Sequence, residues 1–182
     1  MADTILKDLG SVVKYGGGII RLSECSDAGV LIGSDYTELP YLEVTERFDE
    51  RDEEKVYDET GNIIKRRYGN RDVGLTATLM QVDAATLDFI MAAEFKYYTL
   101  YYKVTKTTAI NGKTQELFAG IVQLKPSFRI QSGQQKIPIS FTFLPNPNTT
   151  SITIATPNTL FDAVETDSVT IEAGQYYDVV EN

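Results

Sequence analysis

Side chains that commonly carry out catalysis are sparse in this chain of 182 residues. It contains no histidine, and histidine is the commonest general base and a frequent metal ligand. Ser23 and Cys25 therefore lack the partner that usually activates a nucleophile. With one cysteine, the chain can form neither an intrachain disulfide nor a thiolate metal cluster. We expect no catalytic residue, cofactor or metal ligand, and hence no enzyme activity.

Other chemical patterns are incomplete. A phosphate-binding loop needs glycines before a helix N-terminus, whereas Gly16-Gly17-Gly18 precedes a predicted strand. Carboxylates are numerous enough for the pair used by glycoside hydrolases, but they gather on a charged hairpin and near the C-terminus, where no dry cleft is expected. Their spacing also lacks the glycine that an EF-hand calcium loop requires.

Four tyrosines on one predicted strand allow two interpretations. Tyr97, Tyr98, Tyr101 and Tyr102 would suit a platform on which bases or sugars stack. The alternative places them in the core and at a subunit contact, where an amphipathic ring suits a half-wet surface. The formal net charge of −9, from 17 basic and 26 acidic residues, disfavours nucleic-acid binding through phosphate contacts.

The stretch 48–71 is charged nearly throughout, with acidic residues first and basic residues after a turn at Thr60-Gly61-Asn62. Few apolar residues (Val56, Ile63, Ile64) could anchor it, so we predict a long hairpin arm. One interpretation is a solvated hairpin whose strands pair opposite charges. The other is an arm whose two sides meet complementary surfaces of neighbouring subunits. The candidate inter-subunit or inter-ring residues are Asp49, Glu50, Asp52, Glu53, Glu54, Lys65, Arg66, Arg67 and Arg71.

The most periodic stretch, 72–106, predicts a strand, a helix and a second strand. Alternation of Val73, Leu75, Ala77 and Leu79 with smaller or polar residues has the period of a half-buried strand. The predicted helix spans 83–94, with Asp83 as its N-cap. Its apolar stripe, expected to pack against a sheet, comprises Leu87, Ile90, Met91 and Phe95. An aromatic and β-branched run from Lys96 to Val104 predicts the following strand.

Shorter patterns predict further strands at 19–22, 30–32, 41–48, 115–123 and 136–144. Asn111-Gly112 is a hairpin turn signal, and residues 1–15 are predicted to form an arm. In the last strand, Pro138 predicts either an edge strand or a position whose nitrogen faces away from a partner. Leu117, Ala119 and Ile121 are expected on one face of their strand, opposite Phe118 and Val122.

Together these patterns predict a mainly β protein: a β-sandwich or barrel with one short flanking α-helix, the charged hairpin arm and a C-terminal extension. Residues 1–148 would form the β domain, and residues 149–182 an extension with short strands at 152–155 and 168–172, which is too small to bury a core alone. We find no apolar run of signal-peptide or membrane-spanning length, so we expect no export and no membrane anchor.

The sequence from Asn62 to Leu75, with the layout around it, resembles the tail tube proteins (major tail proteins) of tailed bacteriophages and the inner tube proteins of contractile injection systems. The likeness covers about residues 15–148. It consists of a charged arm, a strand at 72–81, a short helix at 83–94, a hairpin and a strand at 135–144 before a variable C-terminus.

The resemblance implies a structural virion protein, made in the host bacterial cytoplasm, that assembles into hexameric rings stacked as a hollow tail tube. Implied partners are other copies of itself and tape-measure, terminator and baseplate proteins, while DNA passes through the lumen without specific binding. Candidate lumen-facing residues are Thr76, Thr78, Ser140 and Thr142. The alternatives are a tail terminator or adaptor that forms single rings, and a carbohydrate-binding β-sandwich that uses the tyrosine strand.

Overall fold

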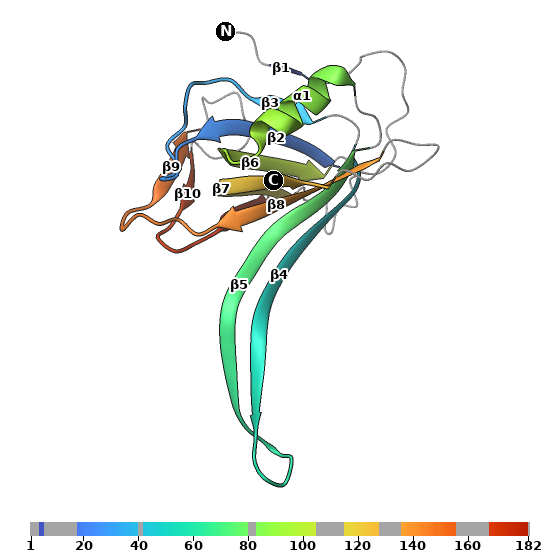
Figure 1. Ribbon diagram of the computed structural model, residues 1–182. Helices are drawn as coiled ribbons and strands as arrows, with labels where there is room; N and C mark the ends of the chain where they lie inside the picture. Colours follow the sequence, from blue (N-terminus) through green and yellow to red (C-terminus); the bar gives the residue numbers. More distant parts are fainter. Residues whose placement is uncertain are drawn as a thin grey trace.

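The fold is mainly β, as predicted, with one short helix packed against an open, largely antiparallel sheet (Figure 1). The computed structural model describes residues 4–5, 18–39, 42–79, 83–104, 115–127, 136–155 and 168–181. The predicted turn at Asn111-Gly112 and most of the predicted arm at 1–15 lie outside these ranges. A second, two-stranded sheet covers part of the main one and gives the fold its sandwich character.

The main sheet has nine strands, eight of which follow one another in a single order. That order is β1 (Thr4–Ile5), β3 (Thr37–Leu39), β2 (Gly18–Cys25), β6 (Tyr97–Val104), β7 (Gln115–Pro126), β8 (Ile137–Leu144), β5 (Ile63–Leu79) and β4 (Leu42–Tyr57). All neighbouring pairs are antiparallel except β1 and β3. The ninth strand, β11 (Tyr177–Glu181), pairs with β7.

Helix α1 (Ala84–Ala93) begins as predicted, because the Asp83 carboxylate accepts a hydrogen bond of 2.7 Å from the Thr86 N–H. Ile90 and Ala93 are fully buried in the core between the helix and the sheet. The predicted apolar stripe is wrong at its C-terminal end. Met91 and Phe95 point to solvent, because the helix meets the sheet through its Thr86, Ile90 and Ala93 side instead.

Strand β7 is buried on both faces from Glu116 to Val122, and a β-bulge exchanges those faces half-way along the strand. Thr99 on β6 lies opposite both Gly120 and Ile121, and its hydroxyl donates to the Gly120 carbonyl over 3.0 Å. Beyond the bulge, Val122 joins the core under α1 while Ile121 faces the second sheet. The strict alternation expected from sequence is therefore wrong for these two residues.

The C-terminal segment forms two elements that differ in their partners. Strands β9 (Ile152–Ala155) and β10 (Ser168–Ile171), close to the predicted positions, pair with each other and pack on Tyr101, Phe118 and Ile121 of the main sheet. Strand β11 was not predicted. It pairs with Gln115–Ala119 of β7, directly before the stretch that pairs with β8, so β8 and β11 lie end to end along the same edge of β7.

Buried Asn146 connects the two ends of the segment that contains β9 and β10. Its side-chain amide donates 3.0 Å hydrogen bonds to the Thr150 and Ile171 carbonyls. Its backbone N–H donates to Gln175, and its carbonyl accepts from Gly174. These contacts return the chain to β7 at Tyr177.

Two local predictions differ from the structure. The predicted strand at 30–32 is a loop with a single bridge between Leu31 and Cys25, and Val30 and Ile32 are exposed. Pro138 does not lie on an edge strand, because β8 runs between β7 and β5. The other expectation for Pro138, a nitrogen that faces away from a partner, is also wrong: its carbonyl accepts from the Ser127 N–H, so its nitrogen faces Ser127 too, just past the last paired residue of β7.

Candidate assembly interface

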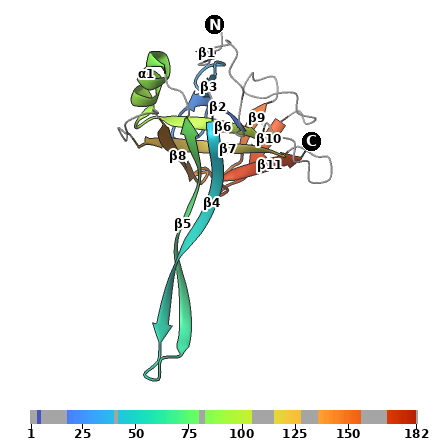
Figure 2. The ribbon, with the colours of Figure 1, turned by 90° about the vertical axis from the view of Figure 1, so that its right-hand side faces the viewer.

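The predicted arm (residues 48–71) is the outer part of the β4–β5 hairpin, which projects far from the body of the protein (Figures 1 and 2). Pairing of β5 with β8 ends at Gly74, so beyond this point the two arm strands have only each other. At about 3.3 Å per residue, the stretch from Glu50 to Tyr57 extends roughly 25 Å beyond the body.

The root of the arm is fixed by an aromatic residue and an ion pair. Phe48 lies opposite Gly74 with its ring over the glycine Cα, where no side chain intervenes. Arg71 donates to both Asp49 carboxylate oxygens, at 2.8 and 2.6 Å, and these hydrogen bonds raise the pKa of the guanidinium. The Arg71 guanidinium also lies 5.1 Å from the Tyr176 ring, just before β11.

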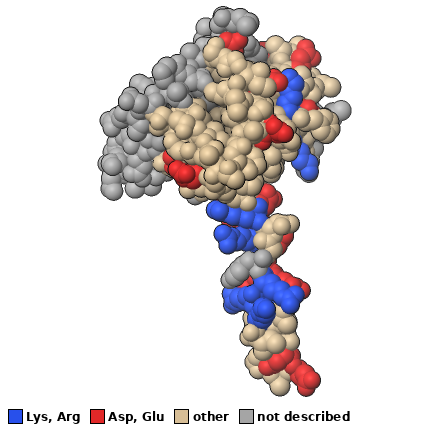
Figure 3. Space-filling model, turned by 90° about the vertical axis from the view of Figure 1, so that its left-hand side faces the viewer, with Lys and Arg blue, Asp and Glu red and all other residues tan. Residues whose placement is uncertain are grey.

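The shaft of the arm, residues 50–56 and 65–70, pairs opposite charges across its two strands, as the solvated-hairpin interpretation expects. Glu53 lies 3.2 Å from Arg66, and Glu54 lies 3.7 Å from Arg67. Basic side chains gather along one side of the shaft (Figure 3). Three of the predicted interface residues, Glu50, Asp52 and Lys65, make no ion pair within the described part of the chain. The structure thus satisfies some of the arm's charges internally and leaves others available.

The arm tip, defined as Tyr57, the turn Asp58–Asn62, Ile63 and Ile64, has a hydrogen-bonded turn and carries apolar side chains. One Asp58 carboxylate oxygen accepts hydrogen bonds from the Thr60 N–H, the Thr60 hydroxyl and the Asn62 N–H, at 2.8–2.9 Å. Next to this turn, Tyr57 is 56% exposed and Ile64 is 65% exposed. Of the three apolar residues predicted to anchor the arm, Ile63 and Ile64 therefore point to solvent, because no part of the described body reaches them, whereas Val56 is partly buried.

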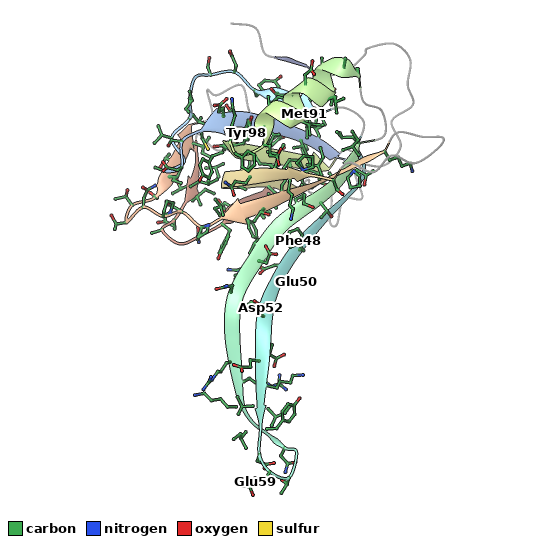
Figure 4. All side chains as sticks on the ribbon, in the orientation of Figure 1. Phe48, Glu50, Asp52, Glu59, Met91 and Tyr98 are labelled. Atoms are coloured by element: carbon green, nitrogen blue, oxygen red, sulfur yellow. The ribbon has the colours of Figure 1, made fainter. Side chains whose placement is uncertain are left out.

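A second exposed apolar group lies on α1, at the opposite end of the molecule (Figure 4). This α1 patch consists of Met91, Ala92 and Phe95; Met91 is 60% and Phe95 85% exposed. Phe95 has φ 71° in a turn that the Lys96 N–H closes onto the Ala93 carbonyl over 3.2 Å. With Glu94 at φ −58° and ψ 132°, this is type II geometry, which favours glycine where Phe95 stands. The left-handed backbone costs roughly 1 kcal/mol, and the exposed ring gains no burial in return.

The sheet offers two further surfaces. Among the described strands, β4 pairs only with β5, so its other edge is open. On the face away from the α1 core, the candidate lumen residues come together. Thr76 lies opposite Ser140, which lies opposite Lys125, and Thr142 lies between Gly74 and Gln123. Thr76, Ser140 and Thr142 therefore share one face of the sheet.

Residues with possible chemistry are buried. Burial raises the pKa of the Cys25 thiol to about 11 and that of the Tyr98 hydroxyl to about 12. Tyr101 is fully buried, and Tyr97 and Tyr102 are partly buried against the two cores. The four tyrosines therefore belong to the packing, with no continuous ring surface on which a ligand could stack.

Ion pairs that sequence analysis missed lie across the face covered by the second sheet. Buried Glu38 accepts from Arg21 over 3.1 Å, and the Arg21 guanidinium lies 4.8 Å from the Tyr36 ring and 5.8 Å from the Tyr101 ring. Lys103 lies 3.2 Å from buried Glu116. In each case the two residues are register partners, and only strand register, which sequence does not provide, brings them together.

Within the described residues, no group of three or more Cys, Asp or Glu side chains is arranged to hold a metal ion. The described residues also include no helix long and apolar enough to cross a membrane.

Comparison with known proteins gives distant structural likeness and no match of sequence. No family model matches the chain, and no curated protein matches it. Among solved structures, the chain is similar to a chain of the cryo-EM structure of the anti-feeding prophage baseplate, which is 6-fold symmetrised. The match has 9% sequence identity and a TM-score of 0.32, and it covers 74% of this chain and 92% of the other. A likeness this slight carries no argument about function.

Proposed function

We propose that this chain is a non-enzymatic structural protein of a phage-like tail, and that it assembles into hexameric rings stacked as a hollow tail tube. The observation that carries the proposal is the arm. A hairpin that projects roughly 25 Å with almost every described side chain exposed gains little stability from its own chain, so its length is best explained by a contact with another molecule.

The open edge of β4 supports ring formation. An unpaired edge exposes a row of backbone N–H and C=O groups and promotes uncontrolled aggregation. Pairing with a neighbouring copy satisfies these groups, and a head-to-tail contact that closes into a ring leaves no edge free. In the proposed tube, this pairing joins subunits within a ring and the arm joins one ring to the next.

The polar face around Thr76 and Ser140 is proposed to line the lumen. Its hydroxyl groups offer no strong contact to phosphate. Lys125, opposite Ser140 on the same face, adds one positive charge, whereas the chain as a whole carries a net charge of −9. Passing DNA would be repelled more than bound. Partners in the virion would be the tape-measure, terminator and baseplate proteins.

Negative-stain electron microscopy of the concentrated protein tests the proposal. Hollow tubes with a regular axial repeat are expected. Single rings that never stack would instead identify a tail terminator or adaptor. Protein that stays monomeric at all salt concentrations would contradict ring assembly, and a glycan array would then test the carbohydrate-binding alternative.

An arm-deletion variant tests the role of the arm. Glu50 and Asp72 are direct partners across the hairpin, so replacing residues 51–71 by Asn-Gly closes the strands with a tight turn. We expect a folded protein that forms no stacked tubes. Regular tubes from this variant would refute a stacking role for the arm.

A further inference from the structure

We infer that the arm tip of one copy docks on the α1 patch of a second copy; this inference rests on the proposed stacking function and names its contact. The two surfaces lie at opposite ends of one molecule in both views (Figures 1 and 2). Two unlike surfaces at opposite ends form a head-to-tail contact that can repeat without limit.

The arm tip and the α1 patch both expose large apolar side chains. Tyr57 and Ile64 project from a hydrogen-bonded turn, and Met91 and Phe95 project from the last turn and the end of α1. Each group is small, so it does not prevent the monomer from remaining in solution. Burying them against each other would remove from water the most exposed large apolar side chains of both elements.

Charges beside the two apolar groups are complementary in part: the tip turn itself carries the acidic residues Asp58 and Glu59, and the basic residues lie on the strands next to it. On the arm, Lys65 directly follows Ile64 and makes no ion pair within the described chain. On the helix, Glu94 directly precedes Phe95 and, like Asp88, makes none there either. The nearest basic residue, Lys96, is already paired with Glu24 at 3.0 Å. The α1 patch therefore has acidic neighbours, and the strand next to the arm tip has a lysine, none of which makes an ion pair among the described residues.

The backbone at Phe95 also indicates a contact. A residue kept in an unfavourable left-handed conformation with its ring in water lowers the stability of the monomer, and such features are retained where they serve an interaction. Phe95→Gly should therefore act in opposite directions on folding and assembly. We expect a higher melting temperature and a rise of about tenfold in the concentration needed for assembly. A variant that melts higher and assembles as before would overturn the role of Phe95.

Cysteine cross-linking tests the contact directly. Native Cys25 is buried and its pKa is raised to about 11, so it should not react. Ile64→Cys protein is mixed with Met91→Cys protein and oxidised, and each sample is also viewed by electron microscopy. We expect a disulfide-linked dimer only in the mixture, and long ladders from the double variant. Val30→Cys is the matched control, because Val30 is an equally exposed apolar residue on a body loop.

Each result is decisive. Stacked rings without an Ile64–Met91 cross-link, or with cross-links only to Val30→Cys, would overturn the docking contact and leave the tube proposal intact. Cross-linked chains without rings would support the contact and refute ring assembly. Neither assembly nor cross-links would refute both.

Discussion

The body and the arm of this protein are made of the same strands, yet they are stabilised in different ways. Inside the body, β5 lies between β4 and β8 and buries Val73, Leu75 and Leu79 almost completely. In the arm, the same strand has one partner and its described side chains are exposed from Ile63 to Asn70. Burial of apolar surface supports the body, whereas the arm relies on strand pairing, exposed ion pairs and a well-bonded turn.

This difference shows that one strand can serve two purposes along its length. Exposed ion pairs each contribute about 0–1 kcal/mol, so the arm keeps its shape mainly because its strands continue into a rigid sheet. Changes in the body should therefore alter folding, and changes in the arm should alter contacts with other molecules. Four measurements test that division, in order of expected effect.

Phe141→Ala should have the largest effect on folding. The Phe141 ring on β8 is fully buried, and removing such a ring usually costs about 3–5 kcal/mol. The free energy of unfolding is measured with denaturant. The control, Ile64→Ala on the arm tip, should change it by less than about 0.5 kcal/mol. Equal losses in the two variants would contradict the division.

Gly74→Ala tests the junction between body and arm. A Cβ at this position would collide with the Phe141 carbonyl oxygen and with the Phe48 ring. The ring can rotate but the backbone carbonyl cannot, so we expect a loss of about 1–3 kcal/mol. Gly120→Ala is the matched control inside the body, since its Cβ would lie at an ordinary 3.4 Å from Ile171. If Gly120→Ala proved the more harmful, the close approach at Gly74 would not be what limits that site.

Glu53→Gln should have a small effect that depends on salt. It removes one partner of the 3.2 Å pair with Arg66, and an exposed pair is worth about 0.2–1 kcal/mol. The difference from the unmodified protein should shrink between low and high ionic strength because salt screens exposed charges. Unfolding curves at both salt concentrations measure it. A loss that does not change with salt would mean that packing, rather than charge, is affected.

The arm tip should respond only to acid. Hydrogen bonds from Thr60 and Asn62 hold the pKa of Asp58 below its usual range. Because the folded-state pKa is lowered, the tip is stabilised above the ordinary carboxyl pKa of about 3.9, and this stabilisation is lost as the pH falls through the lowered value. An NMR titration of the Asp58 carboxyl, with hydrogen exchange of the Thr60 amide, measures this. Titration at the ordinary value would show that the turn is not formed in solution.

Much of the local structure follows from sequence alone. The Asp83 cap, the alternation of Ile137, Ile139, Phe141 and Phe143, and the charge separation of the arm are short-range patterns, and each appears at the predicted place. They depend on backbone geometry and on whether one face meets water, which neighbouring residues report directly.

Features that depend on which strands meet were not predictable in the same way. The bulge opposite Thr99 moves Val122 to the other face, and register partners such as Arg21 and Glu38 are separated in the chain. Pro138 was expected on an edge strand, but it lies inside the sheet, at the point where β7 ends. The candidate interface follows the same rule: sequence predicted the charged arm, but not that Met91 and Phe95 would face solvent.

The sequence by itself determined the type and position of most elements, because helical and strand periodicities are local. Only the tertiary structure decided that β11 continues the line of β8, that the arm tip is apolar and exposed, and that the α1 patch lies at the end opposite to it. These features depend on the packing of residues distant in the chain. Which apolar residues remain in water is known only after the core has been filled.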